Sequence, residues 1–442
     1  MGGIVFYAFG DLKYVLLLLG LCAANYGLAF VCHDAPKEGR QAGKIRAVVG
    51  LPDKELSGEA QADSQRRMFV GIVILDVFVL ILFKTLSFVM NTPIPLGISF
   101  YIFKMLSFQA DLYTGRIKKM PSLPVVLAYF TLFFQLAQGP IMRFDPKEFT
   151  RRRHRFSLKR IEEGMKFLII GLAMKVLLAD KLAILWSEAS KIGYAGLSTP
   201  LAWFAIIGFL LQLYLDFWGY SLMAAGIGVI IGFSFIANFN HPYAALSVGE
   251  FYRRWHMTLT SWFKDYVYIP LGGSRSTTQR TLLNIMIVWL LTGFWHGGAL
   301  HYILWGLALG VIICVEKAFA AQLEQIPAIG RRLILIFLMP FTWVLFAVER
   351  PTDIAVYFSR MLPLTGRFAG ANAADFGRLF GYFWLYVALG IVLCIPAVYR
   401  WIEKPKAGTA RYAEAVILCV LLWISLYTIS ISSANPFLYV KF

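Results

Sequence analysis

The chain has 442 residues, of which 59% are hydrophobic, 16% aromatic and only 15% charged, and its formal net charge is +17. A soluble domain carries about 25% charged residues, so this composition excludes an ordinary soluble globular protein and indicates one that is solvated by lipid. The basic residues stand in short loops beside Trp and Tyr, as the positive-inside rule expects, and no nucleic-acid-binding motif accompanies them. We therefore expect membrane lipid, and not nucleic acid, as a partner.

Apolar runs follow one another along most of the chain, and each is about 20 residues long, enough for a helix to cross a bilayer. Spans in lipid are helices or closed barrels, and these continuous runs exclude the alternating pattern of barrel strands. The sequence predicts an all-α, polytopic bundle of about eleven transmembrane helices, forming one membrane domain over residues 1–442. The expected spans lie near residues 14–32, 69–90, 121–138, 163–185, 198–216, 220–238, 281–297, 301–316, 333–348, 379–399 and 412–432.

The first third of the chain has three features besides its spans. MGGIVFYAFG lacks the basic region and the cleavage site of a signal peptide, so the run from Tyr14 is expected to stay in the membrane. Residues 33–67 are polar, with charges of both signs, and are expected to form a loop. The shorter apolar run at 95–110 carries Lys104 and Gln109 and is expected to be interfacial or re-entrant.

Two basic loops set the expected orientation. Residues 143–160 and 250–280 are rich in Lys and Arg and should face the cytoplasm. Loops on one side need an even number of crossings between them, yet three apolar runs separate these two. Either one run does not cross, which we expect, or one basic loop lies on the other side. The segment 250–280 is also aromatic and is expected to be re-entrant or interfacial, with its cations near lipid phosphates or an anionic cofactor.

The sequence shows no sign of a metal site, a disulfide framework or a serine triad. The five cysteines include no CxxC pair, and GxSxG is absent. His296 and His301 are five residues apart with no glutamate between them, which is not the spacing of a zinc helix. We therefore expect no metal and no tightly bound cofactor.

His296 is the candidate catalytic residue because it lies between two apolar runs, in NIMIVWLLTGFWHGGALHYILWG. An ionisable residue at such depth is costly and indicates a functional site, and imidazole suits proton transfer near neutral pH. Gly293 and Gly297 form a GxxxG spacing that lets a helix or a substrate approach the backbone. A structural histidine, hydrogen-bonded to a neighbouring helix, explains the same residues, and both interpretations stay open here. Asp216, in LYLDFWGYSL, is expected to pair with a basic residue, backbone donors or water.

A family resemblance runs through most of the chain. It rests on FYAFGDLKYVLLLL near the start, PLGISFYIFKMLSFQADLYTG at 95–115, QLAQGPIMRF at 135–144, LYLDFWGYSLMAAGIGVIIGF at 213–233, NFNHPYAALSVGEFYRRWHMTLTSWFKDYVYIPLGG at 238–273 and LLTGFWHGGALHYILWG at 290–306. These segments resemble the membrane-bound O-acyltransferases and, within that family, the membrane subunits of bacterial alginate O-acetyltransferases. The teichoic-acid D-alanyl transfer proteins are more distant.

The resemblance implies a tunnel across the protein, with an acyl thioester such as acetyl-CoA at the cytoplasmic mouth and an acceptor hydroxyl at the opposite one. His296, in Trp-His-Gly, matches the family's near-invariant histidine, and His256, in Arg-Arg-Trp-His, matches a second histidine linked to activity. We expect His296 to act as a general base and His256 to help bind the donor. The expected substrate-binding residues are Trp255, Arg254, Trp295, Gly297, Asp265, Asn240 and Asp216.

The implied function is acyl transfer in the bacterial inner membrane. The acceptor is expected to be a hydroxyl of an extracytoplasmic polysaccharide or of a partner acetyl-transfer protein, and the group an acetyl. Transfer of D-alanine or another acyl group on the same fold stays an alternative. A transporter or flippase is a second alternative, although no duplicated half is visible.

The chain departs from the family pattern in two places. The pattern after the intramembrane Asp is commonly Phe-Ser-Gly-Tyr-Ser-Asp, whereas here Trp218 replaces the serine and Leu222 the second aspartate. Any role for those two positions is therefore in doubt, and an altered cavity is expected. The family usually carries one more apolar stretch before FYAFG, so the chain is expected to be short at its N-terminus.

Overall fold

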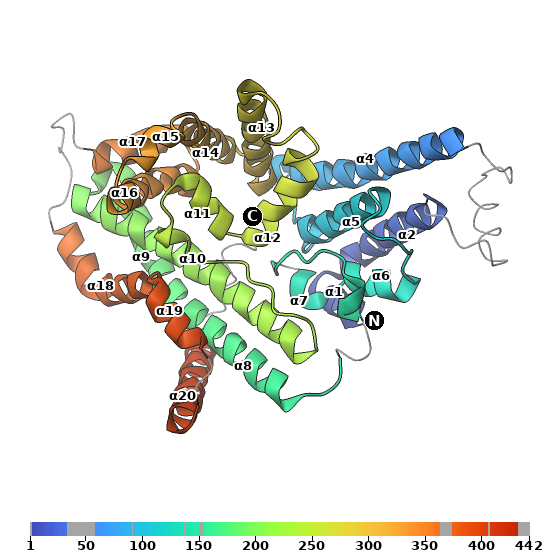
Figure 1. Ribbon diagram of the computed structural model, residues 1–442. Coiled ribbons are helices and arrows are strands. Elements are labelled where there is room, and N and C mark those ends of the chain that lie inside the picture. Colours follow the sequence, from blue (N-terminus) through green and yellow to red (C-terminus); the bar gives the residue numbers. More distant parts are fainter. Residues whose placement is uncertain are drawn as a thin grey trace. The chain divides into compact units, whose positions relative to one another are not determined.

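The computed structural model describes residues 2–32, 58–90, 92–136, 138–149, 154–362, 374–404 and 407–431. These residues form helices and connecting loops, with no β-strand among them (Figure 1). The expected all-α class is therefore confirmed. The chain divides into two compact units, one of Met1–Phe156 with Gly232–Ser234 and one of Ser157–Ile231 with Phe235–Phe442.

Several helices of the described residues are long and apolar enough to cross a bilayer, which confirms a multi-pass membrane protein. The seven that meet both criteria are Leu12–Phe30, Asp63–Met90, Thr199–Ile230, Leu300–Ala318, Ala328–Ala347, Asp375–Leu393 and Thr409–Ile431. This count is lower than the expected eleven because the run at 121–138 forms two short helices, two runs are fused into one helix, and the helices over 163–185 and 281–297 are not among the seven.

The first unit packs around the buried helix α5. Its elements are α1 (Gly2–Gly10), η1 (Leu12–Tyr14), α2 (Val15–Cys32), α4 (Gly58–Met90), α5 (Ile98–Tyr113), α6 (Leu123–Phe130), α7 (Phe133–Leu136) and η2 (Pro146–Phe149). Helix α5 contacts α2, α4, α6 and α7, and nearly all of its side chains are buried. The run at 95–110, expected to be interfacial or re-entrant, is thus an internal helix of this unit.

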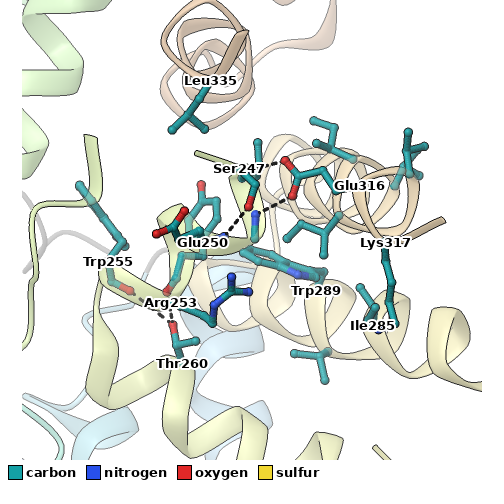
Figure 2. A pocket seen from close by; sticks show the side chains of 18 of the residues that line it. Ser247, Glu250, Arg253, Trp255, Thr260, Ile285, Trp289, Glu316, Lys317 and Leu335 are labelled. Carbon is teal, nitrogen blue, oxygen red and sulfur yellow. Dashed lines mark hydrogen bonds between the residues drawn. The ribbon is translucent and has the colours of Figure 1, made fainter. Parts of the chain in front are cut away.

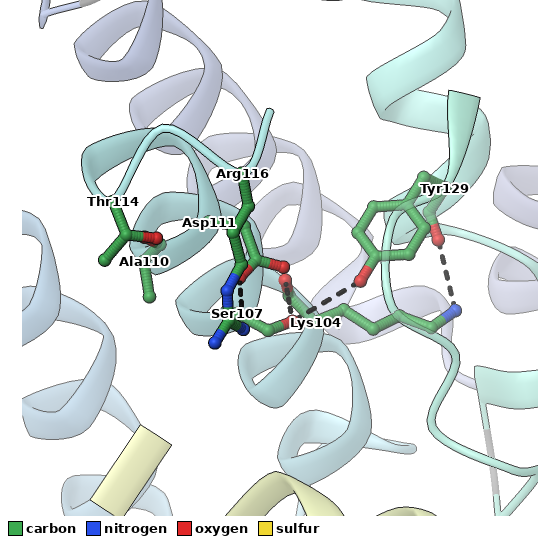
Figure 3. Close-up of polar contacts among 7 residues, drawn as sticks. All are labelled: Lys104, Ser107, Ala110, Asp111, Thr114, Arg116 and Tyr129. Carbon is green, nitrogen blue, oxygen red and sulfur yellow. Dashed lines mark hydrogen bonds and ion pairs between the residues drawn. The ribbon is translucent and has the colours of Figure 1, made fainter. Parts of the chain in front are cut away.

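Helix α5 can be internal because its polar side chains have protein partners. Lys104 Nζ donates a hydrogen bond to the Tyr129 carbonyl at 3.1 Å, and Ser107 Oγ donates to the Lys104 carbonyl at 2.9 Å (Figure 3). Gln109 Nε2 donates to the Asn25 carbonyl at 2.8 Å. A buried polar group without a partner costs about 1–3 kcal/mol, so these bonds remove the main obstacle to burial.

The loop expected over residues 33–67 ends earlier than expected. Helix α4 begins at Gly58, and residues 33–57 lie outside the described residues. The stretch GEAQADSQRR is rich in Ala, Glu, Gln and Arg, which are good helix formers even where they are charged. Asp63 and Arg67, one turn apart, form an ion pair at 2.8 Å. These residues therefore begin a helix, and the loop prediction is wrong for residues 58–67.

Two expected spans of the second unit are one helix. Helix α10 (Thr199–Ile230) runs without a break where separate spans at 198–216 and 220–238 were expected. It packs on a continuous helical stretch made of α8 (Leu158–Ala173), the π-helical η3 (Met174–Ala179) and α9 (Asp180–Ile192) (Figure 1). The three apolar runs between the two basic loops thus form two helical stretches, of which only α10 is among the seven long apolar helices. The expectation that one run does not cross the membrane stays a prediction.

Glycines explain why α10 continues through the expected break. A Cβ at Gly226 would lie 2.5 Å from the Gly164 carbonyl oxygen, and a Cβ at Gly219 would lie 2.6 Å from that of Gly171. From the first pair to the second, the residue number rises along α8 and falls along α10, so the two helices are antiparallel. Gly219 thus permits close backbone contact within a helix.

The rest of the second unit begins with short elements and continues with longer helices. They are η4 (Tyr194–Gly196), η5 (Pro242–Ala244), α11 (Val248–Arg254), α12 (Met257–Phe263), the π-helical η6 (Lys264–Tyr268), α13 (Thr278–His296), α14 (Leu300–Ala318), α15 (Ala320–Glu324), α16 (Ala328–Ala347), α17 (Pro351–Met361), α18 (Asp375–Leu393), α19 (Pro396–Glu403) and α20 (Thr409–Ile431). The segment 250–280 contains none of the seven long apolar helices, since α11 and α12 have seven residues each. Its placement at the interface or within the membrane stays a prediction.

Candidate functional site

A cavity of about 900 Å³ lies within the second unit. Its walls come from α11, α12 and η6 and from α13 to α16, and Figure 2 shows Trp255, Trp289 and Glu316 among the side chains that line it. The lining includes exposed Lys264 and Lys317 as well as buried His256 and His296. We call it the two-histidine cavity. Ligand pockets commonly enclose about 300–1,000 Å³, so this space can hold a small molecule or the end of a long one.

His296 lies at the end of α13 and is enclosed by aromatic rings. Its side chain is 8% exposed, and its ring centroid is 4.6 Å from that of Trp295, 5.0 Å from Trp305 and 5.3 Å from Phe346. These rings limit water around the imidazole and hold it at one edge of the cavity. An imidazole in such a place can exchange a proton with a bound group while water is excluded.

The position of His296 depends on a close crossing of α13 and α14. A Cβ at Gly293 would lie 2.5 Å from the Tyr302 carbonyl oxygen, and a Cβ at Gly306 would lie 2.5 Å from that of Trp289. A Cβ at Gly297 would meet the Tyr302 ring at 2.6 Å. The GxxxG spacing therefore serves helix packing. His296 also lines the cavity, so helix packing does not exclude the functional interpretation, which stays a prediction.

His256 is held by an unusual backbone conformation and by one amide. It directly precedes α12, and its backbone, at φ 45° and ψ 54°, lies in the left-handed region that non-glycine residues rarely occupy. Its side chain is 3% exposed, and Nδ1 lies 3.0 Å from Oδ1 of Asn238. Strained residues of this kind cluster at functional sites. Burial lowers the pKa of His256 to about 3, so the ring is neutral at physiological pH.

Aromatic rings join the two histidines. The Trp295 ring centroid lies 6.5 Å from that of His256 and 4.6 Å from that of His296. Trp255, beside His256, stacks on Phe251 at 5.5 Å and lines the cavity. The two imidazoles are therefore parts of one apolar site, separated by a single ring.

Charged side chains also line the cavity. The basic ones are exposed Arg253, Lys264 and Lys317 and half-buried Arg331, and the acidic ones are Glu250, Glu316 and Glu324. Glu316, also in the lining, accepts hydrogen bonds from the backbone N–H groups of Val248, at 2.5 Å, and Gly249, at 2.8 Å, at the start of α11 (Figure 2). Part of the negative charge thus serves α11, and the exposed cations of the lining can pair with an anionic ligand.

The structure brings some of the expected site residues together and leaves others apart. Of the nine expected, His256, His296 and Trp255 line the two-histidine cavity. Arg254 pairs with Glu250, and Asp216 forms a buried ion pair with Lys175 at 2.9 Å. The remaining four do not line it: Trp295 and Gly297 flank His296, half-buried Asp265 follows Lys264, and exposed Asn240 donates its backbone N–H to the Arg254 carbonyl.

Sequence reasoning missed several residues of the site. Glu316 stood at the end of an apolar run, where an acidic residue is itself a signal. Trp289 and Trp305, which line the cavity, had no signal beyond their residue type. Asn238 carries no charge and stands in a loop, so nothing in its spacing pointed to His256. Within the described ranges, no three His, Cys, Asp or Glu side chains are grouped so that they could hold a metal ion.

Comparison with known proteins gives consistent matches. The model of the MBOAT, membrane-bound O-acyltransferase family matches residues 65–348. The chain is 30% identical to a probable alginate O-acetylase AlgI of Azotobacter vinelandii over 87% of each chain, and 32% identical to a probable alginate O-acetylase AlgI of Pseudomonas aeruginosa over 78% of this chain and 65% of that one. It is 29% identical to a peptidoglycan O-acetyltransferase of Helicobacter pylori, over 83% and 73% of the two chains.

These matches cover the helices that build the two-histidine cavity, from α11 to α16. They confirm the resemblance inferred from the motifs and the interpretation of the chain as an enzyme. The seven long apolar helices agree with that assignment. The chain therefore belongs to the membrane-bound O-acyltransferase family, as a multi-pass O-acyltransferase of the bacterial inner membrane.

Proposed function

We propose that this enzyme moves an acetyl group from a cytoplasmic acyl thioester, such as acetyl-CoA, to a hydroxyl of an extracytoplasmic polysaccharide or of a partner acetyl-transfer protein. The observation that carries the proposal is that His296 and His256 line one cavity together with the exposed cations Arg253, Lys264 and Lys317. A thioester needs such a place, where a neutral base is near the acyl carbon and water is scarce.

In this mechanism His296 is the general base. One nitrogen of its imidazole takes the proton of the acceptor hydroxyl as the oxygen attacks the thioester carbonyl carbon. The new C–O bond forms, the C–S bond breaks, and the proton passes from the imidazolium to the departing thiolate. Proton transfer by a positioned side chain gives about 10² to 10⁴ in rate. The aromatic rings around His296 favour this step, because they keep water from competing with the acceptor.

The exposed cations of the cavity support an anionic thioester donor. Arg253, Lys264 and Lys317 are exposed and line the same cavity as the two histidines. Phosphate groups of a coenzyme A or of a carrier-bound phosphopantetheine match these cations. His256 and Trp255, deeper in the same space, are then placed to contact the acyl end of the donor.

Names of relatives support acetyl as the group and a polysaccharide as the final acceptor. The alginate O-acetylase of Azotobacter vinelandii is matched over 87% of this chain and the peptidoglycan O-acetyltransferase over 83%. A teichoic acid D-alanyltransferase of Streptococcus thermophilus is matched over only 52%, at 28% identity. The acetyl group is therefore favoured over D-alanine.

The test is His296→Gln in the purified, membrane-reconstituted protein, with isotope-labelled acetyl donor and the cell-envelope polysaccharide fraction. His301→Gln is the matched control, since His301 is also buried and lies five residues on, but does not line the cavity. We expect His296→Gln to lose at least about 100-fold in acetyl transfer while His301→Gln keeps it. Equal activity of both variants, with equal folding, would show that His296 is not the general base. If a labelled D-alanyl donor delivers its label and the labelled acetyl donor does not, the transferred group is D-alanine and not acetyl.

A further inference from the structure

Asn238 lies at the centre of a buried hydrogen-bond network behind His256. The residue is 3% exposed and does not line the two-histidine cavity. Its Oδ1 lies 3.0 Å from His256 Nδ1, accepts from Thr258 Oγ1 at 2.9 Å and accepts from the Thr258 backbone N–H at 3.3 Å. Its Nδ2 donates to Ser221 Oγ at 3.1 Å. Both ends of the amide are thus engaged.

This network determines which nitrogen of His256 carries the proton. A backbone N–H is always a donor, so the Asn238 atom that faces Thr258 N is the oxygen and not the amide nitrogen. An amide oxygen only accepts, and therefore His256 Nδ1 must donate to it. A neutral imidazole has one N–H, so Nε2 holds the lone pair and is a hydrogen-bond acceptor.

The backbone holds the two residues in register. Met257 N donates to the Asn238 carbonyl at 2.8 Å, and Asn240 N donates to the Arg254 carbonyl at 2.9 Å. The left-handed conformation of His256 lies between these two bonds, at φ 45°. A non-glycine residue in that region is strained and persists only where its surroundings fix it. Here the surroundings turn the Nδ1 edge of the ring to Asn238.

We propose that Asn238 is a positioning residue that holds His256 in the Nδ1–H tautomer, so that Nε2 is kept as a hydrogen-bond acceptor for an N–H or O–H group of the substrate. The proposal rests on the proposed acyl transfer. It assigns a role to Asn238 that neither the place of this residue in the sequence nor its residue type predicted. Asn238 acts through His256 and touches no reacting atom. A protonated Nε2 would offer a donor instead, and would repel the same group.

The first test is ¹⁵N NMR of the ring nitrogens in reconstituted protein labelled at histidine, with the His256 signals assigned by their loss in His256→Gln. We expect a protonated Nδ1 and an unprotonated Nε2 in the natural protein and in Ser221→Ala, which removes only the partner of Asn238 Nδ2. We expect Asn238→Ala to show both tautomers. A natural protein with protonated Nε2 overturns the proposal, whatever acyl group the enzyme moves.

The second test is a double-mutant cycle on the rate of thioester cleavage in the presence of acceptor. Asn238→Ala alone is expected to lower the rate about 10- to 100-fold, the effect of leaving one buried hydrogen-bonding group unsatisfied. In the His256→Gln background, the same substitution is expected to change the rate less than about twofold. An equal loss in both backgrounds means that Asn238 acts on the fold and not through His256, and overturns the proposal. If the NMR spectra and the double-mutant cycle give the expected results but no acetyl group is transferred, only the choice of acetyl as the acyl group is wrong.

Discussion

Alanine at Gly293 is expected to impair acyl transfer more than it impairs folding. Gly293 lies three residues before His296 and touches α14 through backbone atoms alone, since an added Cβ would lie 2.5 Å from the Tyr302 carbonyl oxygen and 3.4 Å from Cα of Gly306. Atoms in contact need about 3.5 Å. The end of α13 must therefore move away from α14 by up to about 1 Å, and His296 moves with it.

The expected magnitudes follow from this displacement. Overpacking lowers the free energy of unfolding by about 1–3 kcal/mol, and alanine in place of glycine within a helix raises it by about 1 kcal/mol. The net loss of stability is then about 0–2 kcal/mol. A misplacement of about 1 Å at a reacting group costs about 100-fold in rate. The rate should thus fall far more than the thermal midpoint of unfolding.

The assay compares Gly293→Ala with Gly310→Ala, by initial rate of acyl transfer and by thermal unfolding in the same detergent. Gly310 lies on the same helix pair, but a Cβ there would meet Met286 Sδ at 2.9 Å, and that flexible side chain can move aside. The helix-propensity gain is the same for both variants, so the difference between them measures the backbone contact. Equal rates for the two variants would refute the reasoning.

Three further predictions concern charge and protonation. Lys175→Met should destabilise the fold by about 3–5 kcal/mol because it leaves Asp216 buried without its cation, whereas Arg411→Gln, which breaks an exposed pair, should cost less than about 1 kcal/mol; chemical denaturation measures both. The pKa of His256 is about 3 in the folded protein and 6.5 ordinarily, so His256 of the unfolded chain is protonated first as the pH falls. The stability of the fold should therefore be full above about pH 6.5 and decline toward pH 3, by at most about 1.4 kcal/mol per pH unit. His256→Gln should flatten that decline in a series of unfolding measurements. Arg253→Gln should raise the KM for the thioester several-fold, more at low salt than at high salt, and leave kcat nearly unchanged; a salt-independent KM would contradict an electrostatic role.

The apolar runs and motifs predicted class, family and reaction correctly, but helix boundaries less well. Residues 198–238 contain two apolar runs around Asp216 and Gly219, and each residue taken alone suggests an interruption. Within the fold, Asp216 is neutralised by Lys175, and Gly219 admits the backbone of α8. One continuous helix results, because both features that would interrupt a helix in isolation are satisfied by its neighbour.

What the sequence determined by itself is the chemistry that lipid imposes locally. A histidine between apolar runs, glycines four apart and cations grouped in loops can be recognised residue by residue, because each has a cost or a benefit that does not depend on distant contacts. Only the tertiary structure decided which of them meet. It joined His256 to His296 through the ring of Trp295, placed Arg253 and not Arg254 in the cavity lining, and set Asn238 behind His256. Those outcomes depend on the direction in which each side chain leaves its helix or loop and on the helix packed against it, and neither is encoded in spacing along the chain.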